Sequence, residues 1–291
     1  MIDGPEIVMT TDNAAEVLAA WEVSSQYWNK HQALIEKMYA PLSLALIDEA
    51  QIVSGEAVLD VGGGSGEPSL TIARVVGDSG SVTYTDPAAG MVKAARAEAE
   101  RRGLANIQFH QCPAEQLPFA DAAFDAGVGR LSVMFFPDVV AGLREVLRVI
   151  KPGGHVSFLV WANKDVNPFF SVVTEILDRF VPAEPQAEDA PEAFRFAASG
   201  KLAKLLAEAG ATSITERTFA FSIEAPITVE QFWELRTEMS DTIRNKLARL
   251  VPDQVGAIKY TVQKKVGSYF KTGGMVFPGQ VLLVTGQKPG N

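Results

Sequence analysis

Hydrophobic and polar positions change period repeatedly along the middle of the chain. Short apolar runs typical of buried strands alternate there with segments whose apolar residues recur at helical spacing. This alternation predicts an α/β fold with a doubly wound, mostly parallel sheet that helices cover on both faces. The expected strands cover 57–62, 81–85, 107–111, 124–129 and 155–161, and the expected helices cover 69–76, 88–102 and 139–150.

The helix over 139–150 has the clearest pattern, because its apolar residues fall on one face. The Lys-Pro-Gly-Gly sequence at 151–154 is typical of a turn, so we expect it to end this helix before the strand at 155–161. Pro68 fits the first turn of the helix over 69–76, where a missing N–H costs little. Gly103 is well placed to stop the helix over 88–102.

Further helices are expected on either side of this middle region. Residues 12–50 read as helical and carry Trp21, Tyr27, Trp28 and Tyr39. Later segments predict helices over 168–180, 201–209, 228–250 and 252–270, a loop over 181–193, and strands over 213–222 and 280–287. We therefore expect four parts: an N-terminal helical cap (1–50), an α/β core (51–222), a helical insertion forming a substrate cap (223–278), and the final core strand (279–291).

Composition narrows the classes of partner. A formal net charge of −9 disfavours nucleic acid, since an acidic surface repels phosphate backbones. Cys112 is the single cysteine, which excludes an intramolecular disulfide and a cysteine zinc cluster, and the three histidines match no metal-ligand spacing, so we expect no metal. The sequence has no apolar stretch of about 18 residues and no apolar signal core at its start, so we expect a cytoplasmic location.

A glycine-rich loop follows the first expected strand, in the sequence Val-Leu-Asp-Val-Gly-Gly-Gly-Ser-Gly-Glu-Pro at 58–68. Glycines at this place let the backbone turn sharply and approach a ligand. Gly62, Gly64 and Gly66 form Gly-x-Gly-x-Gly, whereas a dinucleotide fingerprint is Gly-x-Gly-x-x-Gly. Glu67 and Asp60 add negative charge where a pyrophosphate would lie. These groups suit a ligand with a cationic end better than a phosphate.

Asp86 ends the second expected strand, 20 residues after Gly66. A carboxylate at this place can accept hydrogen bonds from both ribose hydroxyls of a nucleoside. Because NAD enzymes and methyltransferases share this feature, Asp86 predicts adenosine binding without choosing between the two classes.

Several motifs together resemble the class I S-adenosylmethionine-dependent methyltransferases, specifically the small-molecule group similar to ubiquinone/menaquinone-biosynthesis C-methyltransferases. The resemblance runs from about Val58 to Trp161. It depends on the glycine loop at 58–66, Thr-Asp at 85–86, Ala-Glu-Gln-Leu-Pro-Phe at 114–119, Phe-Asp at 124–125 and Arg-Val-Ile-Lys-Pro-Gly-Gly at 148–154. It implies a Rossmann-like sheet of seven strands, the last antiparallel, with our strands over 213–222 and 280–287 as the sixth and seventh.

The resemblance also implies which residues contact S-adenosylmethionine or its product S-adenosylhomocysteine. The glycine loop would lie against the methionine part, Asp86 would bind the ribose, and the turn at 112–115 would edge the adenine. Pro113 stands where many relatives have an acidic residue, so adenine recognition would depend on backbone groups around it. The implied cofactor-binding set is Asp60, Gly62, Gly63, Gly64, Gly66, Asp86, Pro87, Met91, Cys112, Ala114, Glu115, Arg130 and Leu131.

Other residues allow two interpretations. Trp28, Tyr27 and Met38 could close over the sulfonium or pack on the core. His31 could be a general base or a solvated helix residue, and His110 and His155 fit structural positions in strands. Cys112 fits packing better than nucleophilic chemistry. Phe135, Phe136 and Trp161 could belong to the core or to a pocket wall.

The sequence thus predicts methyl transfer by SN2 displacement to a small, largely apolar, aromatic or quinone-like acceptor. An aromatic-rich N-terminal helix motivates this acceptor class, together with the aromatic residues of the 223–278 insertion, which are Phe232, Trp233, Tyr260, Tyr269 and Phe270. No residue is assigned as a catalytic base, and monomer and homodimer both stay open. The alternatives are an NAD(P)-dependent oxidoreductase, which shares the glycine loop and Asp86, and a non-catalytic S-adenosylmethionine- or S-adenosylhomocysteine-binding protein.

Overall fold

The computed structural model describes residues 11–183, 187 and 189–290. Parts of the expected N-terminal cap and of the expected loop over 181–193 lie outside these residues. The centre is one mixed sheet in the order β3-β2-β1-β4-β5-β8-β6, with the short β7 beside β8. The strands are β1 (Ala57–Val61), β2 (Ser81–Asp86), β3 (Ile107–Gln111), β4 (Phe124–Arg130), β5 (Ile150–Trp161), β6 (Thr212–Ala225), β7 (Phe270–Lys271) and β8 (Gly274–Gln287).

The first five strands are parallel, and β8 pairs antiparallel with both β5 and β6. This confirms the predicted α/β class and the expected antiparallel last long strand. The strand order reverses between β1 and β4, where parallel sheets open a crevice at the carboxyl ends of their strands.

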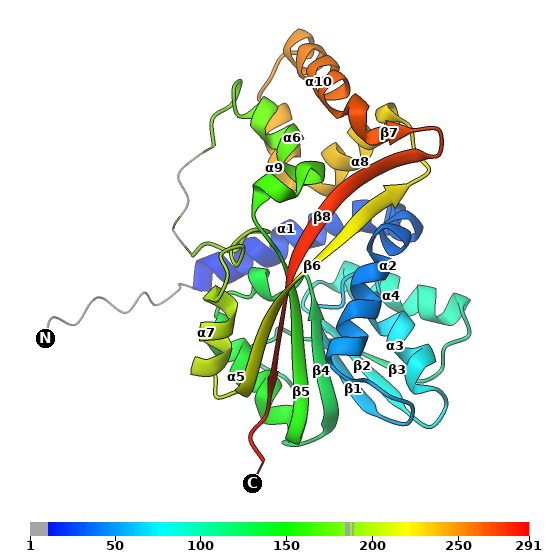
Figure 1. Ribbon diagram of the computed structural model, residues 1–291, viewed down its shortest axis with the longest axis vertical. Helices are drawn as coiled ribbons and strands as arrows, with labels where there is room; N and C mark the ends of the chain where they lie inside the picture. Colours follow the sequence, from blue (N-terminus) through cyan, green and yellow to red (C-terminus); the bar gives the residue numbers. More distant parts are fainter. Residues whose placement is uncertain (1–10, 184–186, 188, 291) are drawn as a thin grey trace, which may run out of the picture.

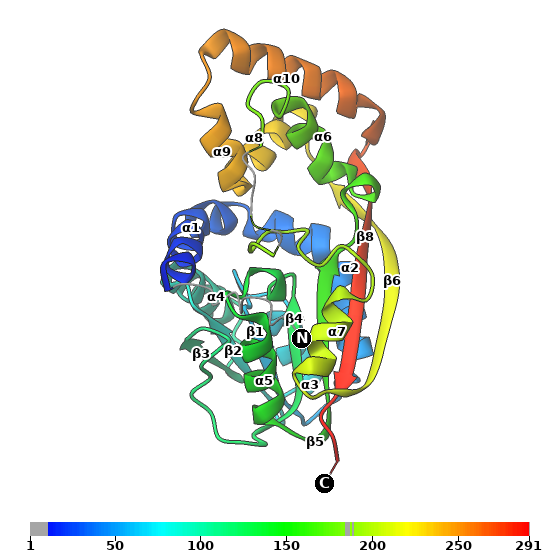
Figure 2. The same cartoon turned by 90° about the vertical axis from the view of Figure 1, so that its left-hand side faces the viewer.

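Helices cover both faces of the sheet, and a second group forms a cap beyond its carboxyl edge (Figures 1 and 2). On the sheet lie α2 (Gln32–Glu49), α3 (Ser69–Val76), α4 (Ala89–Arg101), α5 (Val139–Val149) and α7 (Lys201–Glu208). The cap contains α6 (Pro168–Leu177), α8 (Val229–Met239), α9 (Asp241–Leu247) and α10 (Pro252–Val266). Helix α1 (Thr11–Lys30) runs between the sheet and the cap. Three 3₁₀ turns complete the described elements: Val133–Phe135, Lys164–Val166 and Gly267–Tyr269.

The strand predicted over 155–161 begins earlier than expected. Ile150 directly follows α5 and is already the first residue of β5, so the turn predicted at 151–154 is wrong. The Pro-Gly-Gly segment stays in the sheet because the β4–β5 register shifts between Phe124 and Ala126, which accommodates extra residues as a bulge does. The backbone of Lys288 pairs with this segment through two hydrogen bonds. Gly153 N donates to Lys288 O, and Lys288 N donates to Gly154 O.

Three predicted helices are shorter than their apolar patterns indicate. The segment over 12–50 breaks at His31 into α1 and α2. The segment over 228–250 breaks at Ser240, whose Oγ accepts from Ile243 N at 3.3 Å and starts α9. The segment over 252–270 leaves the α-helix after Val266.

The last two predicted strands are longer than their patterns indicate. β6 and β8 pair from Thr212 opposite Gln287 to Ala225 opposite Met275. Their far ends leave the rest of the sheet and reach into the cap (Figure 1). This antiparallel ribbon connects the sheet with the cap, while buried side chains from the core strands and from α6 and α8 join one hydrophobic core.

Candidate functional site

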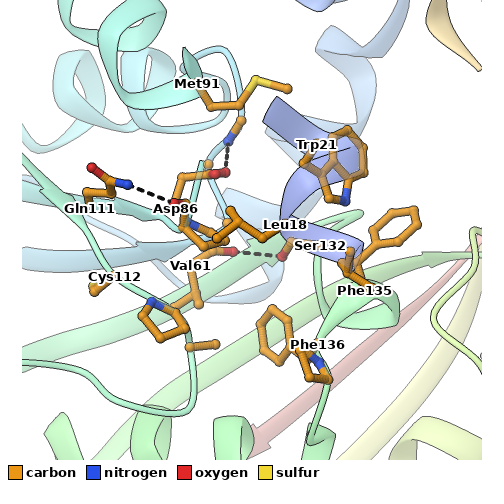
Figure 3. A pocket seen from close by; sticks show the side chains of 18 of the residues that line it. Leu18, Trp21, Val61, Asp86, Met91, Gln111, Cys112, Ser132, Phe135 and Phe136 are labelled. Atoms are coloured by element: carbon orange, nitrogen blue, oxygen red, sulfur yellow. Dashed lines mark hydrogen bonds between the residues drawn. The ribbon is translucent and has the colours of Figure 1, made fainter. Parts of the chain in front are cut away.

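A cavity of about 730 Å³ opens at the carboxyl ends of β1, β2 and β4, beneath α1. Figure 3 shows side chains from the sheet on one side of it and Leu18 and Trp21 of α1 on the other. Pockets at this switch point of an α/β sheet are where such folds bind nucleotides. A volume of this size accommodates a small-molecule ligand.

The glycine loop forms the floor of the cavity. Its path is held by Gly62 N and Gly63 N, which both donate to Thr85 O, at 2.9 and 3.0 Å. A Cβ atom on Gly63 would lie 2.5 Å from Cδ2 of Tyr84, so no side chain fits there. The Tyr84 hydroxyl donates to Gly64 O at 2.5 Å. The loop is therefore fixed in a shape that turns its backbone toward the cavity.

Asp86 lies in the cavity wall with its carboxylate held by two backbone groups. Oδ2 accepts from Gly64 N at 3.0 Å, and Oδ1 accepts from Ala88 N at 2.9 Å. Burial raises the pKa of Asp86 to about 6, against the lowering effect of these two hydrogen bonds. Each oxygen keeps a free lone pair, so the carboxylate can still accept hydrogen bonds from a ligand.

Most of the residues that the resemblance selected meet at this cavity, although they come from distant parts of the sequence. Those that line it are Gly62, Gly63, Gly64, Asp86, Pro87, Met91, Cys112, Ala114, Glu115, Arg130 and Leu131. Pro113, whose position lacks the acidic residue of many relatives, lies there too. Gln111 also lines the cavity and donates through Nε2 to Pro87 O at 3.1 Å (Figure 3).

Asp60 and Gly66 lie outside the lining of this cavity. Asp60 is fully buried, and its Oδ2 accepts from Ser69 N at 3.1 Å and Ser69 Oγ at 2.6 Å. Burial raises the pKa of Asp60 to about 7. Gly66 faces helix α3, where a Cβ atom would lie 2.8 Å from Cδ1 of Leu70. Both residues thus position the helix that follows the loop.

Two opposite charges line the inner end of the cavity. Arg130 at the end of β4 donates through Nη1 to Ser43 Oγ at 2.8 Å. Glu67 accepts from Thr71 Oγ1 at 2.7 Å through Oε2, while its buried Oε1 has no hydrogen-bond partner among the described residues. Burial raises the pKa of Glu67, and the Arg130 guanidinium opposes that rise. A ligand with adjacent positive and negative groups would complement this wall.

The opposite wall is apolar and comes largely from α1, of which only the aromatic residues, Trp28 and Tyr27 among them, were connected with the site from the sequence. Trp21 packs edge-on against Phe135 with ring centroids 5.0 Å apart, and Phe136 lies beside them in Figure 3. The lining residues of α1 are Ala14, Ala15, Val17, Leu18, Trp21 and Trp28. Positions 14, 18, 21 and 28 fall on one helix face, a periodicity that could have identified this wall.

The residues left with two interpretations divide between cavity and core. Trp28, Phe135 and Phe136 line the cavity, whereas Trp161 is buried beside Phe170 with ring centroids 4.5 Å apart. Tyr27 and Met38 do not line it. The Arg244 guanidinium covers the Tyr27 ring at 4.6 Å, and Met38 is buried in the core.

None of the histidines lines the cavity, and Cys112, which does, lacks the surroundings of a nucleophile. His31 Nε2 lies 2.6 Å from Glu238 Oε2, and His155 Nε2 lies 2.8 Å from Gln287 Nε2. His110 packs edge-on against Phe119. Burial raises the pKa of Cys112 to about 11, which keeps it a thiol. Over the described residues, no group of three or more histidine, cysteine or acidic side chains could hold a metal ion.

Comparison with known proteins adds to this geometry. A model of the methyltransferase domain family matches residues 59–158. The aklanonic acid methyltransferase DauC of Streptomyces sp. (strain C5) is 34% identical over 184 residues, which cover 62% of this chain and 79% of that protein. The ubiquinone/menaquinone biosynthesis C-methyltransferase UbiE of Cellvibrio japonicus is 40% identical over 118 residues, covering 40% of this chain and 47% of UbiE.

The fold has a counterpart among solved structures. A crystal structure described as a putative methyltransferase from Bacillus halodurans superposes with a TM-score of 0.54 at 23% identity, covering 85% of this chain and 98% of that one. The match to DauC shows that the chain belongs to the S-adenosylmethionine-dependent methyltransferases, with S-adenosylmethionine as its cofactor. Membership of this family, together with the Gly-x-Gly-x-Gly loop, sets the dehydrogenase alternative aside. No helix in the described part of the chain is long and apolar enough to cross a membrane.

Proposed function

We propose that this methyltransferase acts on a small, largely apolar, aromatic or quinone-like acceptor. One observation carries the proposal: the wall of the cavity opposite the glycine loop is built from Leu18, Trp21, Phe135 and Phe136. Flat apolar ligands gain most from such a wall, because their burial removes apolar surface from water and aromatic rings stack favourably. The names of DauC and UbiE, which refer to an aklanonic acid and to quinone biosynthesis, support the same class.

We further propose how the chain holds its cofactor. Asp86 would accept the ribose hydroxyls, with Pro87, Met91 and the 112–115 turn around the adenine. Arg130 would pair with the carboxylate of the methionine part. Oε1 of Glu67, which lies 3.8 Å from Arg102 Nη1 and has no hydrogen-bond partner among the described residues, would accept from the ammonium group. These groups fit an amino acid joined to a nucleoside, since the cavity presents a carboxylate for hydroxyls and a pair of opposite charges for a zwitterion.

The reaction needs little from the protein beyond alignment and exclusion of water. S-adenosylmethionine, when bound, supplies an electrophilic methyl group for SN2 displacement by an acceptor atom. The chain contributes by holding both reactants in one cavity, which replaces a bimolecular encounter with an oriented contact. The Trp21 and Trp28 rings suit a cationic sulfur because aromatic faces attract cations. We assign no general base, because His31, the candidate for that role, does not line the cavity.

The cap is the proposed source of acceptor selectivity. Within the four-part division expected from the sequence, residues 223–278 contribute α8, α9, α10 and β7, which lie over the carboxyl edge of the sheet (Figure 1). A small organic acceptor fits a cavity covered by α1 better than a nucleic acid would, and the net charge of −9 agrees with this choice.

Label transfer from methyl-labelled S-adenosylmethionine tests the proposal. We expect label in small aromatic or quinone compounds from a mixed panel, and none in protein or RNA. Leu18→Ala should raise KM for the acceptor several-fold because it shortens the apolar wall. Leu44→Ala is the matched control, since Leu44 is 59% exposed on α2 and lies outside the cavity lining. Label found only in protein or RNA would refute the acceptor class.

A further inference from the structure

Basic residues gather in one segment of this acidic protein. Residues 249–273, which hold α10, β7 and the turns between and beside them, carry a single acidic side chain, Asp253, and five basic ones: Arg249, Lys259, Lys264, Lys265 and Lys271. The whole chain has a net charge of −9, so its negative charge belongs to the other parts. A part whose charge opposes that of the rest of the chain indicates a nucleic-acid or membrane partner.

The segment lies where a large flat partner can reach it. Helix α10 is the outermost helix of the cap, at the end of the molecule opposite the C-terminus (Figures 1 and 2). Its inner face buries Ile258, Val262 and Val266, and its outer face is exposed. Charges more than about 10 Å from a partner surface are largely screened at physiological salt, so the acidic parts near the sheet oppose docking at this end only weakly.

Three lysines at the carboxyl end of α10 and just beyond it are available to anions. Lys264, Lys265 and Lys271 are exposed and form no salt bridge with any described residue, whereas Lys259 pairs with Glu230. A lysine ammonium is a point charge on a flexible stem, so it binds phosphate groups without requiring a fixed geometry. The three lysines therefore suit a surface that carries many anions.

Exposed apolar side chains accompany these lysines. Tyr260 on α10 and Val251 directly before it are 62% and 60% exposed, more than any other large hydrophobic side chain in the described part of the chain. The Lys264 ammonium lies 5.5 Å from the Tyr260 ring centroid. A tyrosine beside lysines is typical of a membrane interface, where the amphipathic ring lies at the level of the headgroups.

We propose that the outer face of α10 docks on the surface of an anionic lipid bilayer. Lys264, Lys265 and Lys271 attract the headgroups, and Tyr260 enters the interface between headgroups and acyl chains. A bilayer suits this face better than a nucleic acid does, because the exposed Val251 gains from contact with lipid and not from contact with phosphate. A largely apolar acceptor dissolves in such a bilayer, and this link to acceptor supply rests on the proposed function.

Sedimentation of the full chain with lipid vesicles tests this directly. We expect binding to phosphatidylcholine vesicles that contain about 30% phosphatidylglycerol, and about tenfold or more weaker binding to phosphatidylcholine alone. Binding should also weaken when the salt concentration rises from about 0.1 to about 0.5 M, because screening shortens the reach of the lysines. Lys264→Gln with Lys265→Gln should weaken binding about 25-fold, at about fivefold for each lysine, whereas replacing both by Arg should retain it.

Lys37→Gln with Lys93→Gln is the matched control, since both lysines are exposed on helices that cover the sheet and the net charge changes equally. This control should leave vesicle binding unchanged. Three results each overturn the inference: no preference for anionic vesicles, an equal loss of binding in the two double Gln variants, or binding to single-stranded RNA but not to vesicles. Vesicle binding is measured without any acceptor, so its failure would leave the proposed function intact.

Discussion

Asp60 lies outside the cavity and positions helix α3, which follows the glycine loop. Its contribution to the stability of the folded protein depends on pH. Its carboxylate starts α3 through Ser69, yet Oδ1 is buried with no hydrogen-bond partner among the described residues. A folded-state pKa of about 7, above the usual value near 3.9, means that the folded protein binds the proton more tightly than the unfolded chain. Its contribution to stability therefore falls as pH rises between those two values.

The Asp60→Asn variant tests this pH dependence of stability, because asparagine has about the size of aspartate but does not titrate. The free energy of unfolding of the native protein minus that of the variant should fall as pH rises from about 4.5 to 7 and level off above that range. Urea denaturation of both proteins across this pH range measures the difference, and other titrating groups cancel in the subtraction. A difference that stays flat or rises with pH would contradict the placement of a buried, titrating carboxyl at this position.

Gly63 makes a steric prediction at the same loop. Gly63→Ala places a Cβ atom 2.5 Å from the Tyr84 ring, which is itself buried and cannot retreat easily. We expect a loss of about 1–3 kcal/mol of stability, typical of overpacking. Gly256→Ala on α10, where nothing lies within 4 Å of the new Cβ, is the control and should be neutral or stabilising by about 0.5–1 kcal/mol. Equal effects of the two changes on thermal unfolding would refute the close approach.

Among the elements, α1 forms a wall of the cavity, and Glu22 holds it in place. The Glu22 carboxylate accepts from Ala89 N at 2.6 Å and from Gly90 N at 3.1 Å, at the start of α4. Because α1 covers the cofactor cavity, this contact should slow the release of bound product. Glu22→Gln keeps the shape, but its amide has one acceptor oxygen and can retain only one of the two hydrogen bonds, so we expect S-adenosylhomocysteine to dissociate about 5–10 times faster.

Stopped-flow measurement of the intrinsic tryptophan fluorescence follows this release, since Trp21 and Trp28 line the cavity. Glu16→Gln on the exposed side of the same helix is the matched control and should leave the rate as it is. An unchanged dissociation rate in Glu22→Gln would mean that α1 is held by its other contacts, such as the hydrogen bond from Arg244 to Ser24.

The contrast between α1 and the glycine loop explains which elements were predictable. The loop and Asp86 depend on residues close in sequence, so their pattern was sufficient to place them. The docking of α1 depends on Glu22 reaching Ala89, 67 positions away, and no local pattern contains that contact. The turn expected at 151–154 failed for a similar reason, because pairing with Lys288 at the far end of the chain keeps those residues in the sheet.

At the scale of the whole molecule, the sequence was sufficient to predict the sheet and the fold class, but it was not sufficient to predict how the cap is attached. Alternating strands and helices imply a parallel sheet on local periodicity alone. The ribbon of β6 and β8 extends into the cap because Ala225 pairs with Met275, a contact between segments that each have only weak patterns of their own. Ring contacts between Tyr39, Trp161 and Phe170 likewise join α2, β5 and α6, and therefore required the structure.

We propose that the cavity beneath α1 binds S-adenosylmethionine through Asp86. Calorimetric titration with S-adenosylhomocysteine, and separately with NAD, measures this binding. We predict one S-adenosylhomocysteine bound per chain, no NAD binding, and an affinity reduced about 10- to 100-fold in Asp86→Asn, as expected when hydrogen bonds to a carboxylate are weakened. Asp78→Asn, an exposed loop change, should bind like the native protein. Binding of NAD instead, or an unchanged affinity in Asp86→Asn, would contradict the account.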